Sequence, residues 1–456
     1  MTHTNRVPGS FRDPSGFMFV EKGILYRRVN ASYLEEYSFL INSGLYKELV
    51  DSSQLISHIE VESTDTSFRI LQPERIANFS YPYEWSFSQL KDAALLTLDI
   101  QEKAILKGMI LKDASAYNVT FNNGRVIFLD TLSFDKYVEG RPWIAYRQFC
   151  QHFLAPLALM SKKDIRLNSL IKSYIDGIPL DIASSLLPLS SYLNLGLFLH
   201  IHIHAKSQKK HSGELSSKRA KHMKISRKSM LAMIAGLKST IRNLKWAPGG
   251  TEWDDYYSSN NNYNHTSMLD KEQKVNLLLS SIKPDLVWDL GANFGNFSRV
   301  ASDHSKSVVA WDIDPSCVER NYLSLKKHEY NITPLLMDLT NPSPSIGWDC
   351  NERQSFFDRG RPSILLALGL VHHLAISNNI PLSNMFESFA RLSDKLIIEF
   401  VPKSDSQVQK LLSSREDIFE NYSKEGFEDA FLNIYELRSL EKIKDSERSL
   451  YYLEKI

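Results

Sequence analysis

The sequence predicts two domains, an α+β domain in the N-terminal half and a doubly wound α/β sheet in the C-terminal half. Three observations support this prediction. After residue 253, short apolar runs alternate with helical patterns, as in α/β proteins. The first of these runs leads into a turn that contains glycines, "DLGANFGNFSR" (289–299). A basic segment, residues 206–250, separates this half (251–456) from the N-terminal one (1–205).

The bulk composition is that of a globular protein. The 456 residues exceed one ordinary core, and 43% of them are apolar. The net charge of +1 argues against a chain that coats nucleic acid. The three cysteines show no CxxC spacing, which excludes an encoded disulfide framework or zinc cluster and favours a reducing compartment. Without a signal peptide or an 18-residue apolar run, we expect a cytoplasmic protein with no transmembrane segment.

The N-terminal half contains an ordered set of polar residues beside a predicted hairpin. Residues 86–109 have the apolar periodicity of a helix, and "LKDASAYNVTFNNGRVIFLDTLSF" (111–134) follows. Here Asp113 precedes Asn118 by five residues. Two short strands joined by an Asn-Asn-Gly turn then lead to Asp130.

This stretch resembles the catalytic core of the protein-kinase-like fold, and the resemblance extends over about residues 11–200. It implies that Asp113 orients an acceptor hydroxyl and that Asn118 and Asp130 bind Mg²⁺ together with ATP. The chain departs from that family, because Lys112 replaces the usual His-Arg pair and no glycine-rich phosphate loop is present. An active phosphotransferase, a degenerate nucleotide-binding or scaffold domain, and a plain hairpin with incidental acids therefore all remain open.

The segment 206–250 is strongly basic. It carries twelve Lys or Arg between Lys206 and Lys245 against one acid, Glu214. Its later part, 226–244, has helical apolar spacing, and the breaker "WAPGG" ends it. Two hypotheses fit: a solvated helical linker, or a docking surface for an anionic partner such as a membrane, RNA or a phosphorylated glycan. Just before it, His202 and His204 alternate at strand spacing, which predicts the last strand-like edge of the N-terminal domain.

The C-terminal half reads as five strands separated by helices. The predicted strands are 285–290, 307–313, 332–339, 363–374 and 395–401. In a sheet of this kind the ligand lies beyond the C-terminal ends of the strands.

The turn after the first strand distinguishes between two cofactors. A dinucleotide site needs GxGxxG, but after Gly291 the next two positions are Asn293 and Asn296. The other pattern is an acid two residues before GxGxG, and Asp289, Gly291 and Gly295 fit it with Asn293 in the middle position. Asn tolerates a positive φ better than other non-glycine residues, so the turn can form. An acid here favours S-adenosylmethionine (SAM), which carries an ammonium and a sulfonium.

Two further acids end the next strands. Asp312 is placed to bind ribose hydroxyls, and Asp338 is placed to meet the adenine amino group. With "DLGANFG", "WDID", "MDL" and "LALGLVHHL" in order, residues 253–401 resemble a class I SAM-dependent methyltransferase with its Rossmann-like fold. The later runs "IIEFVPKSDSQVQKLL" and "REDIFENYSKEGFEDAF" resemble a bacterial methyltransferase group that includes nodulation-associated proteins.

The resemblance implies methyl transfer to an acceptor that the sequence does not name. His372, His373 and Glu399, at the ends of the fourth and fifth strands, are candidates for a general base. The chain lacks an [ND]PP[YF] motif, which argues against amino methylation of adenine or glutamine. We therefore expect O-methylation of a glycan, small molecule or peptide, with the kinase-like domain phosphorylating or presenting the acceptor. The alternative is a non-catalytic regulator that senses SAM or ATP.

Overall fold

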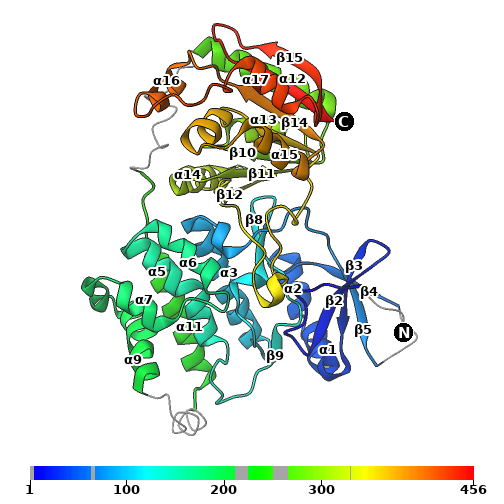
Figure 1. Cartoon of the computed structure of the whole chain (residues 1–456). Helices are drawn as coiled ribbons and strands as arrows, with labels where there is room; N and C mark the ends of the chain where they lie inside the picture. Colours follow the sequence, from blue (N-terminus) through cyan, green and yellow to red (C-terminus); the bar gives the residue numbers. More distant parts are fainter. Residues whose placement is uncertain (1–4, 63–66, 211–223, 250–264, 329) are drawn as a thin grey trace. The chain divides into compact units, whose positions relative to one another are not determined.

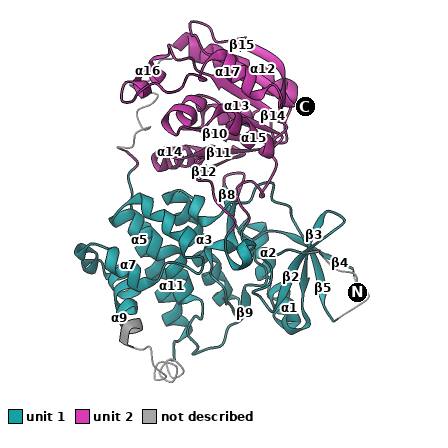
Figure 2. Cartoon of the chain, viewed as in Figure 1, with its two compact units in different colours: residues 1–121, 125–247, 346–353 teal, residues 122–124, 248–345, 354–456 magenta. Residues whose placement is uncertain are grey.

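The computed structural model describes residues 5–62, 67–210, 224–249, 265–328 and 330–456. The chain divides into two compact units (Figure 2). Unit 1 contains residues 1–121, 125–247 and 346–353, and unit 2 contains residues 122–124, 248–345 and 354–456. No helix of the described chain is long and apolar enough to cross a membrane.

Unit 1 begins with a five-stranded antiparallel sheet in the order β1-β2-β3-β5-β4 (Figure 1). Its strands are β1 (Asn5–Arg6), β2 (Gly16–Glu21), β3 (Ile24–Val29), β4 (His58–Val61) and β5 (Arg69–Pro73). Between β3 and β4 the chain forms η1 (Ala31–Tyr33), α1 (Leu34–Asn42) and α2 (Leu45–Asp51). The residues Val29, Tyr33, Tyr37, Leu71 and Leu132 form an apolar cluster.

The predicted helix that follows is α3 (Phe87–Leu106), and it is almost fully buried along one side. Ser86 and Gln89 cap its N-terminus reciprocally, which explains why the helix starts there. The short helix η2 precedes α3. After α3 come two short strand pairs, β6 with β9 and the predicted hairpin β7 with β8. Their bounds are η2 (Pro82–Glu84), β6 (Met109–Leu111), η3 (Ala116–Asn118), β7 (Val119–Asn122), β8 (Arg125–Phe128) and β9 (Phe134–Lys136).

The rest of unit 1 is helical. Its helices are α4 (Tyr146–Phe149), η4 (Cys150–Leu154), α5 (Ala155–Lys162), η5 (Ile165–Ser169), α6 (Leu170–Ser173), α7 (Leu180–Leu186), η6 (Leu189–Leu193), α8 (Leu195–Leu197), η7 (Phe198–His202), α9 (Ile203–Lys210) and α11 (Arg227–Asn243). The histidines His202 and His204 lie on consecutive helical turns, η7 and α9, so the strand-like edge predicted from their alternation is wrong. The largely apolar run before the pair, 195–201, favours a buried helix equally well.

Part of the predicted basic linker is an integral helix of unit 1. Helix α11 packs against α3 through the buried side chains of Met230, Ile234, Leu237 and Ile241. Lys238 is buried between Asp99 and Glu102 of α3, and it forms ion pairs with both. The remaining basic residues at 211–223, and residues 250–264, lie outside the described residues. Residues 227–243 are therefore a packed helix and not a tether.

Unit 2 is a seven-stranded sheet in the order β12-β11-β10-β13-β14-β16-β15. The first five strands are parallel, and β16 is antiparallel to both β14 and β15. The strands are β10 (Leu286–Leu290), β11 (Ser307–Asp312), β12 (Ile332–Leu336), β13 (Ile364–Ala367), β14 (Lys395–Phe400), β15 (Tyr435–Lys442) and β16 (Ser449–Lys455). The five predicted strands are confirmed with shorter ends, and β16 and β15 extend the sheet beyond β14.

Helices cover the sheet of unit 2 (Figure 1). They are α12 (His265–Ile282), α13 (Asn296–Ser302), α14 (Pro315–Leu325), η9 (His373–Ser377), α15 (Leu382–Leu392), α16 (Ser406–Leu412) and α17 (Lys424–Phe431), while η8 (Trp348–Cys350) belongs to unit 1. Strands β10, β11 and β13 are buried along their whole length, which produces the continuous apolar runs of a parallel sheet. Pro334 is tolerated because β12 is an edge strand.

A buried ionic network ties the C-terminal part of unit 2 together. Arg448, the residue just before β16, is almost fully buried and donates two hydrogen bonds to Asp405, at 2.7 and 3.1 Å. Its Nη1 also lies 3.7 Å from a carboxylate oxygen of Glu399 on β14. Lys271 of α12 binds the other oxygen of Glu399 at 2.7 Å. The network thus connects α12, β14, β16 and the start of α16.

We expect Arg448→Leu to lower the free energy of unfolding of unit 2 by about 3–5 kcal/mol, because it leaves buried carboxylates without their partner. Differential scanning calorimetry of the whole chain measures the loss. The matched control is Arg438→Leu on the neighbouring strand β15, where a half-exposed arginine pairs with Glu436 and Glu454. That change should cost about 0–1 kcal/mol. Equal losses in the two variants would contradict a structural role for the buried network.

Candidate active site

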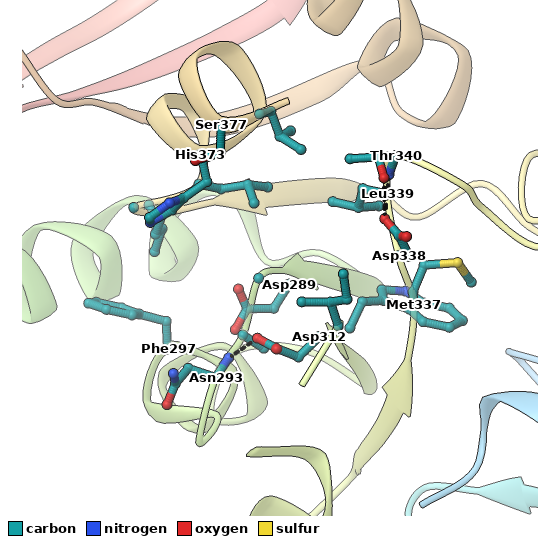
Figure 3. Close-up of a pocket in the computed structure, with 18 of the residues that line it drawn as sticks. Asp289, Asn293, Phe297, Asp312, Met337, Asp338, Leu339, Thr340, His373 and Ser377 are labelled. Carbon is teal, nitrogen blue, oxygen red and sulfur yellow. Dashed lines mark hydrogen bonds between the residues drawn. The ribbon is translucent and has the colours of Figure 1, made fainter. Parts of the chain in front are cut away.

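A pocket of about 340 Å³ lies at the C-terminal ends of the parallel strands of unit 2 (Figure 3). It sits where the strand order reverses, since β11 follows β10 on one side and β13 lies on the other. Ligands of doubly wound sheets bind at such a switch point. The lining residues used below are Met268, Lys271, Asp289, Gly291, Asn293, Phe297, Asp312, Met337, Asp338, Thr340, Leu370, His373 and Ser377.

The turn after β10 has the backbone conformation predicted for it. Gly291, Asn293 and Gly295 all have positive φ, at 72°, 49° and 79°. Asn293 therefore occupies the middle glycine position in the left-handed conformation that asparagine tolerates. A Cβ on Gly295 would lie 2.5 Å from the side-chain amide of Asn321, so this position needs glycine for space as well as for φ.

Asp289, at the end of β10, is buried and lines the pocket. Its carboxylate accepts a hydrogen bond of 2.6 Å from Ser298 at the start of α13. The pKa of Asp289 is raised to about 6, mainly by burial and to a smaller extent by the nearby Asp312, while the Ser298 bond and the charge of Lys271 oppose the shift. This carboxylate is short of positive partners and suits a cationic ligand.

Asp312, at the end of β11, is held by the glycine turn itself. Its Oδ2 accepts a hydrogen bond of 2.7 Å from the backbone N–H of Asn293, and its Oδ1 accepts one of 2.9 Å from Asp314. Burial nevertheless raises the pKa of Asp312 to about 6. Figure 3 shows Asp289, Asn293 and Asp312 grouped on one wall of the pocket.

Asp338 follows β12 and lines the same pocket. One of its oxygens accepts bonds from the backbone N–H and the hydroxyl of Thr340, at 2.8 and 2.6 Å. The three acids predicted at successive strand ends are thus brought together at one cavity, with Asp338 beside Met337 and Thr340 (Figure 3).

The two adjacent histidines occupy different environments. His373 lines the pocket, whereas His372 is fully buried outside the lining, and their rings lie 4.0 Å apart. Burial lowers the pKa of His373 to about 4 and that of His372 well below its ordinary value. At neutral pH His373 is therefore an uncharged imidazole at the pocket wall, which is the form able to accept a proton.

Glu399 does not line the pocket. Its carboxylate is fully buried beneath it and carries the ion pairs with Lys271 and Arg448 described above. Lys271 lines the pocket instead, with its ammonium 4.6 Å from the centre of the Phe297 ring. Sequence reasoning missed Lys271, although it falls on the buried stripe of α12 with Met268, Val275 and Leu279.

In unit 1 the three predicted polar residues also come together. The carboxylate of Asp113 accepts hydrogen bonds from the backbone N–H of Ser115 and the side chain of Gln148, at 2.9 and 2.8 Å. It also accepts one from the side chain of Asn118. Burial raises the pKa of Asp113, and the neighbouring Asp130 raises it further.

Asp130 is already paired with a cation. Arg27 of β3 lies 2.7 Å from its Oδ1, and the same oxygen accepts a bond of 3.0 Å from the backbone of Leu132. Arg27 also lies 3.7 Å from Asp13. Within the described ranges, no group of three or more His, Cys, Asp or Glu is arranged to bind a metal. Metal binding by Asn118 and Asp130 stays a prediction.

Comparison with known proteins finds a relative that matches nearly the whole chain and solved structures that match less than half of it. No family model matches the chain. The nodulation protein NoeA of Rhizobium meliloti (strain 1021) is 36% identical over 461 residues, covering 99% of this chain and 96% of the relative. The N-methyltransferase NodS of Bradyrhizobium japonicum WM9 aligns with 42% of this chain and 98% of its own, at 10% identity and a TM-score of 0.31. Magnesium protoporphyrin IX methyltransferase of Synechocystis PCC 6803, with bound S-adenosylhomocysteine (SAH), covers 44% of this chain and 97% of its own, at 16% identity and a TM-score of 0.33.

The raised pKa values of Asp289 and Asp312, both about 6, predict pH-dependent binding of SAM. Below pH 6 these carboxyls are protonated in the free protein and cannot attract an ammonium, so affinity should fall as the pH drops from 7.5 to 5. Isothermal titration calorimetry at a series of pH values measures the trend.

Asp289→Asn should weaken SAM binding about tenfold or more at pH 7.5 and flatten part of this pH profile. Asp303→Asn, an exposed acid just beyond α13, is the matched control and should leave both unchanged. Unaltered affinity in Asp289→Asn would mean that this carboxylate does not contact the ligand.

Proposed function

The chain belongs to the family of the nodulation protein NoeA, and on that premise we propose that unit 2 is a SAM-dependent methyltransferase. The observation that carries the proposal is the set of three carboxylates, Asp289, Asp312 and Asp338, at the ends of three adjacent parallel strands around one pocket. A dinucleotide cofactor is disfavoured, because the glycine turn lacks two of the three glycines that a pyrophosphate needs.

The residues of the pocket fit SAM by their chemistry. Two buried carboxylates with raised pKa values, Asp289 and Asp312, suit an ammonium and the ribose hydroxyls, and Asp338 suits the adenine amino group. Glycine at positions 291 and 295 adopts the positive φ of the turn and leaves these two positions without side chains where the ligand would approach. When bound, SAM supplies an electrophilic methyl group on its sulfonium.

His373 is the candidate base that we favour in the pocket. His373 is uncharged at neutral pH and lines the cavity, so it can take a proton from an acceptor hydroxyl. Glu399 is a weaker candidate, because Lys271 and Arg448 neutralise it away from the cavity. We therefore propose O-methylation of a glycan, small molecule or peptide, with His373 as the base.

His373→Ala should leave the dissociation constant of SAM within about twofold and lower SAH formation by about 10²–10⁴-fold, the range for loss of a general base. SAH released in the presence of cell extract, measured by mass spectrometry, reports turnover. Ser377→Ala is the matched control, because Ser377 lines the same wall but cannot act as a base at neutral pH.

Normal turnover in His373→Ala would exclude the histidine as the base. Binding of SAM with no SAH release from any extract would favour the alternative, a protein that senses SAM without turning it over.

For unit 1 we propose, as a second candidate function, that it binds ATP with Mg²⁺ and phosphorylates or presents the acceptor. The observation in its favour is that Asp113, Asn118 and Asp130 gather beside a five-stranded antiparallel sheet, as the kinase-like resemblance implies. The ion pair of Asp130 with Arg27 opposes metal binding, because Mg²⁺ would have to displace Arg27 or bind beside it.

Calorimetric titration of the whole chain with ATP and Mg²⁺ tests this second candidate. We expect binding that Asp130→Asn abolishes, since the amide loses the charge that a divalent cation requires. Asp135→Asn, on β9 of the same unit, is the matched control and should bind as the unaltered chain does. No binding by the unaltered chain would leave unit 1 with a presenting or scaffold role.

A further inference from the structure

The stretch 186–203 of unit 1 exposes an unusual number of large apolar side chains. Leu189, Leu193 and Leu195 are 86%, 90% and 70% exposed. Four more exposed apolar residues lie in the same stretch: Leu186, Tyr192, Leu199 and Ile203. Isolated exposed leucines are ordinary on protein surfaces, but such a concentration marks an interaction site. We call these seven residues the leucine patch.

Three residues of the patch, Leu195, Leu199 and Ile203, lie on the helical run from α8 to α9, which is apolar on two sides. Leu197, Ile201 and Ala205 are buried at a spacing of four residues, and they face the rest of unit 1. Leu195, Leu199 and Ile203 repeat at the same spacing, and they are exposed. A Cβ on Gly196 would lie 2.0 Å from the hydroxyl of Thr240, so α8 packs closely on α11. The exposed row is therefore turned outward by tight packing of the opposite one.

Polar contacts fix the preceding turn, η6, against the same run. The ring of the buried His202 is hydrogen-bonded on both sides. Its Nδ1 lies 2.8 Å from the hydroxyl of Ser184 on α7, and its Nε2 lies 2.9 Å from the hydroxyl of Ser191 on η6. The ring of Tyr192 stacks on His202 at 3.8 Å. Figure 1 shows α7 beside α9 at one end of unit 1, and the two helices are in contact. The leucines of η6 and α8 are thus held on a packed scaffold.

The sequence from the patch to residue 213 contains basic residues and no acidic ones. No Asp or Glu occurs between Asp181 and Glu214, whereas Lys206, Lys209 and Lys210 follow the patch directly. Lys206 is exposed, and its ammonium lies 5.8 Å from the ring centre of Tyr192 within the patch. The basic run continues along the chain to residue 228 with Lys218, Arg219, Lys221, Lys224, Arg227 and Lys228 against the single acid Glu214.

We propose that the leucine patch and the adjoining lysines dock unit 1 on the surface of an anionic lipid membrane. Leucines can enter the interfacial region of the bilayer, while the lysines meet acidic headgroups. RNA would use the positive charge but gain little from exposed leucines, since its protein contacts are phosphate pairing and aromatic stacking. No described helix can span a bilayer, so the attachment is peripheral.

Vesicle flotation of the full chain tests the proposal. We expect binding to phosphatidylcholine vesicles that contain about one third phosphatidylglycerol, weaker binding to pure phosphatidylcholine, and a decline with salt. The triple variant Leu189→Ser, Leu193→Ser, Leu195→Ser should lower the partition coefficient on the order of a hundredfold, from the lost burial of apolar side chains. Replacing Lys206, Lys209 and Lys210 by Glu should abolish the preference for anionic vesicles.

A matched control carries Leu277→Ser, Ile418→Ser and Leu432→Ser, three comparably exposed residues of unit 2, and should bind vesicles normally. Unchanged calorimetric melting and SAM titration in each variant would show that folding is intact.

Three outcomes would overturn the proposal. The first is equal vesicle binding by the leucine triple variant and the unaltered chain. The second is gel-shift binding to RNA that the leucine changes leave intact, in a chain that ignores vesicles. The third is a dimer in sedimentation velocity that the leucine changes dissociate, which would make the patch an interface between two copies.

Discussion

The burial of two carboxylates side by side is the constraint around which unit 2 is organised. Asp289 and Asp312 end adjacent strands, β10 and β11, and both are removed from water. Burying an ionised group costs free energy unless hydrogen bonds or an opposite charge compensate. The turn between Gly291 and Gly295 supplies part of the compensation through the N–H of Asn293, and this requires the positive φ values found there. This compensation is incomplete, because burial still raises both pKa values to about 6.

The buried acids of unit 2 differ in whether a cation of the protein neutralises them. Glu399 ends a central strand as Asp289 does, yet Lys271 and Arg448 satisfy it within the protein. A carboxylate that is neutralised within the protein binds a ligand weakly, whereas an acid with few internal partners can bind one more strongly. Lys271 is the link between the two sets, because it binds Glu399 and also lines the pocket. Its charge lowers the pKa of Asp289 slightly against the effect of burial. The network thus fixes the position of α12 at the cavity.

Local sequence patterns were sufficient to predict those parts of the structure in which backbone geometry or strand burial determines the residue type. The glycine turn, the five parallel strands and the three strand-end acids follow from apolar runs, φ requirements and chain order, and they were predictable. Strands β15 and β16 were not, because their half-exposed faces give no continuous apolar run. Lys271 and the choice between His372 and His373 depend on which side chain reaches the cavity, and this is set by contacts distant in sequence. The same limit applies to α11, whose basic residues suggested a solvated helical linker or a docking surface although its apolar stripe packs on α3.

Unit 1 contains a cluster of charged residues that form ion pairs with one another. Asp13, Lys112, Arg27 and Asp130 alternate in sign across β3 and the segments beside it, with contacts between 2.7 and 3.8 Å. Lys112 also donates a bond of 2.6 Å to Ser15, so its ammonium is fixed without any ligand. An ion pair at this level of burial is neutral or mildly stabilising at best, so stability alone is a weak reason for such a cluster. Asp113 differs from Asp130, because its hydrogen bonds come from neutral donors and its pKa is raised. Among Asp13, Asp113 and Asp130, Asp113 is therefore stabilised by neutral hydrogen-bond donors, whereas Asp130 is stabilised by the cation Arg27.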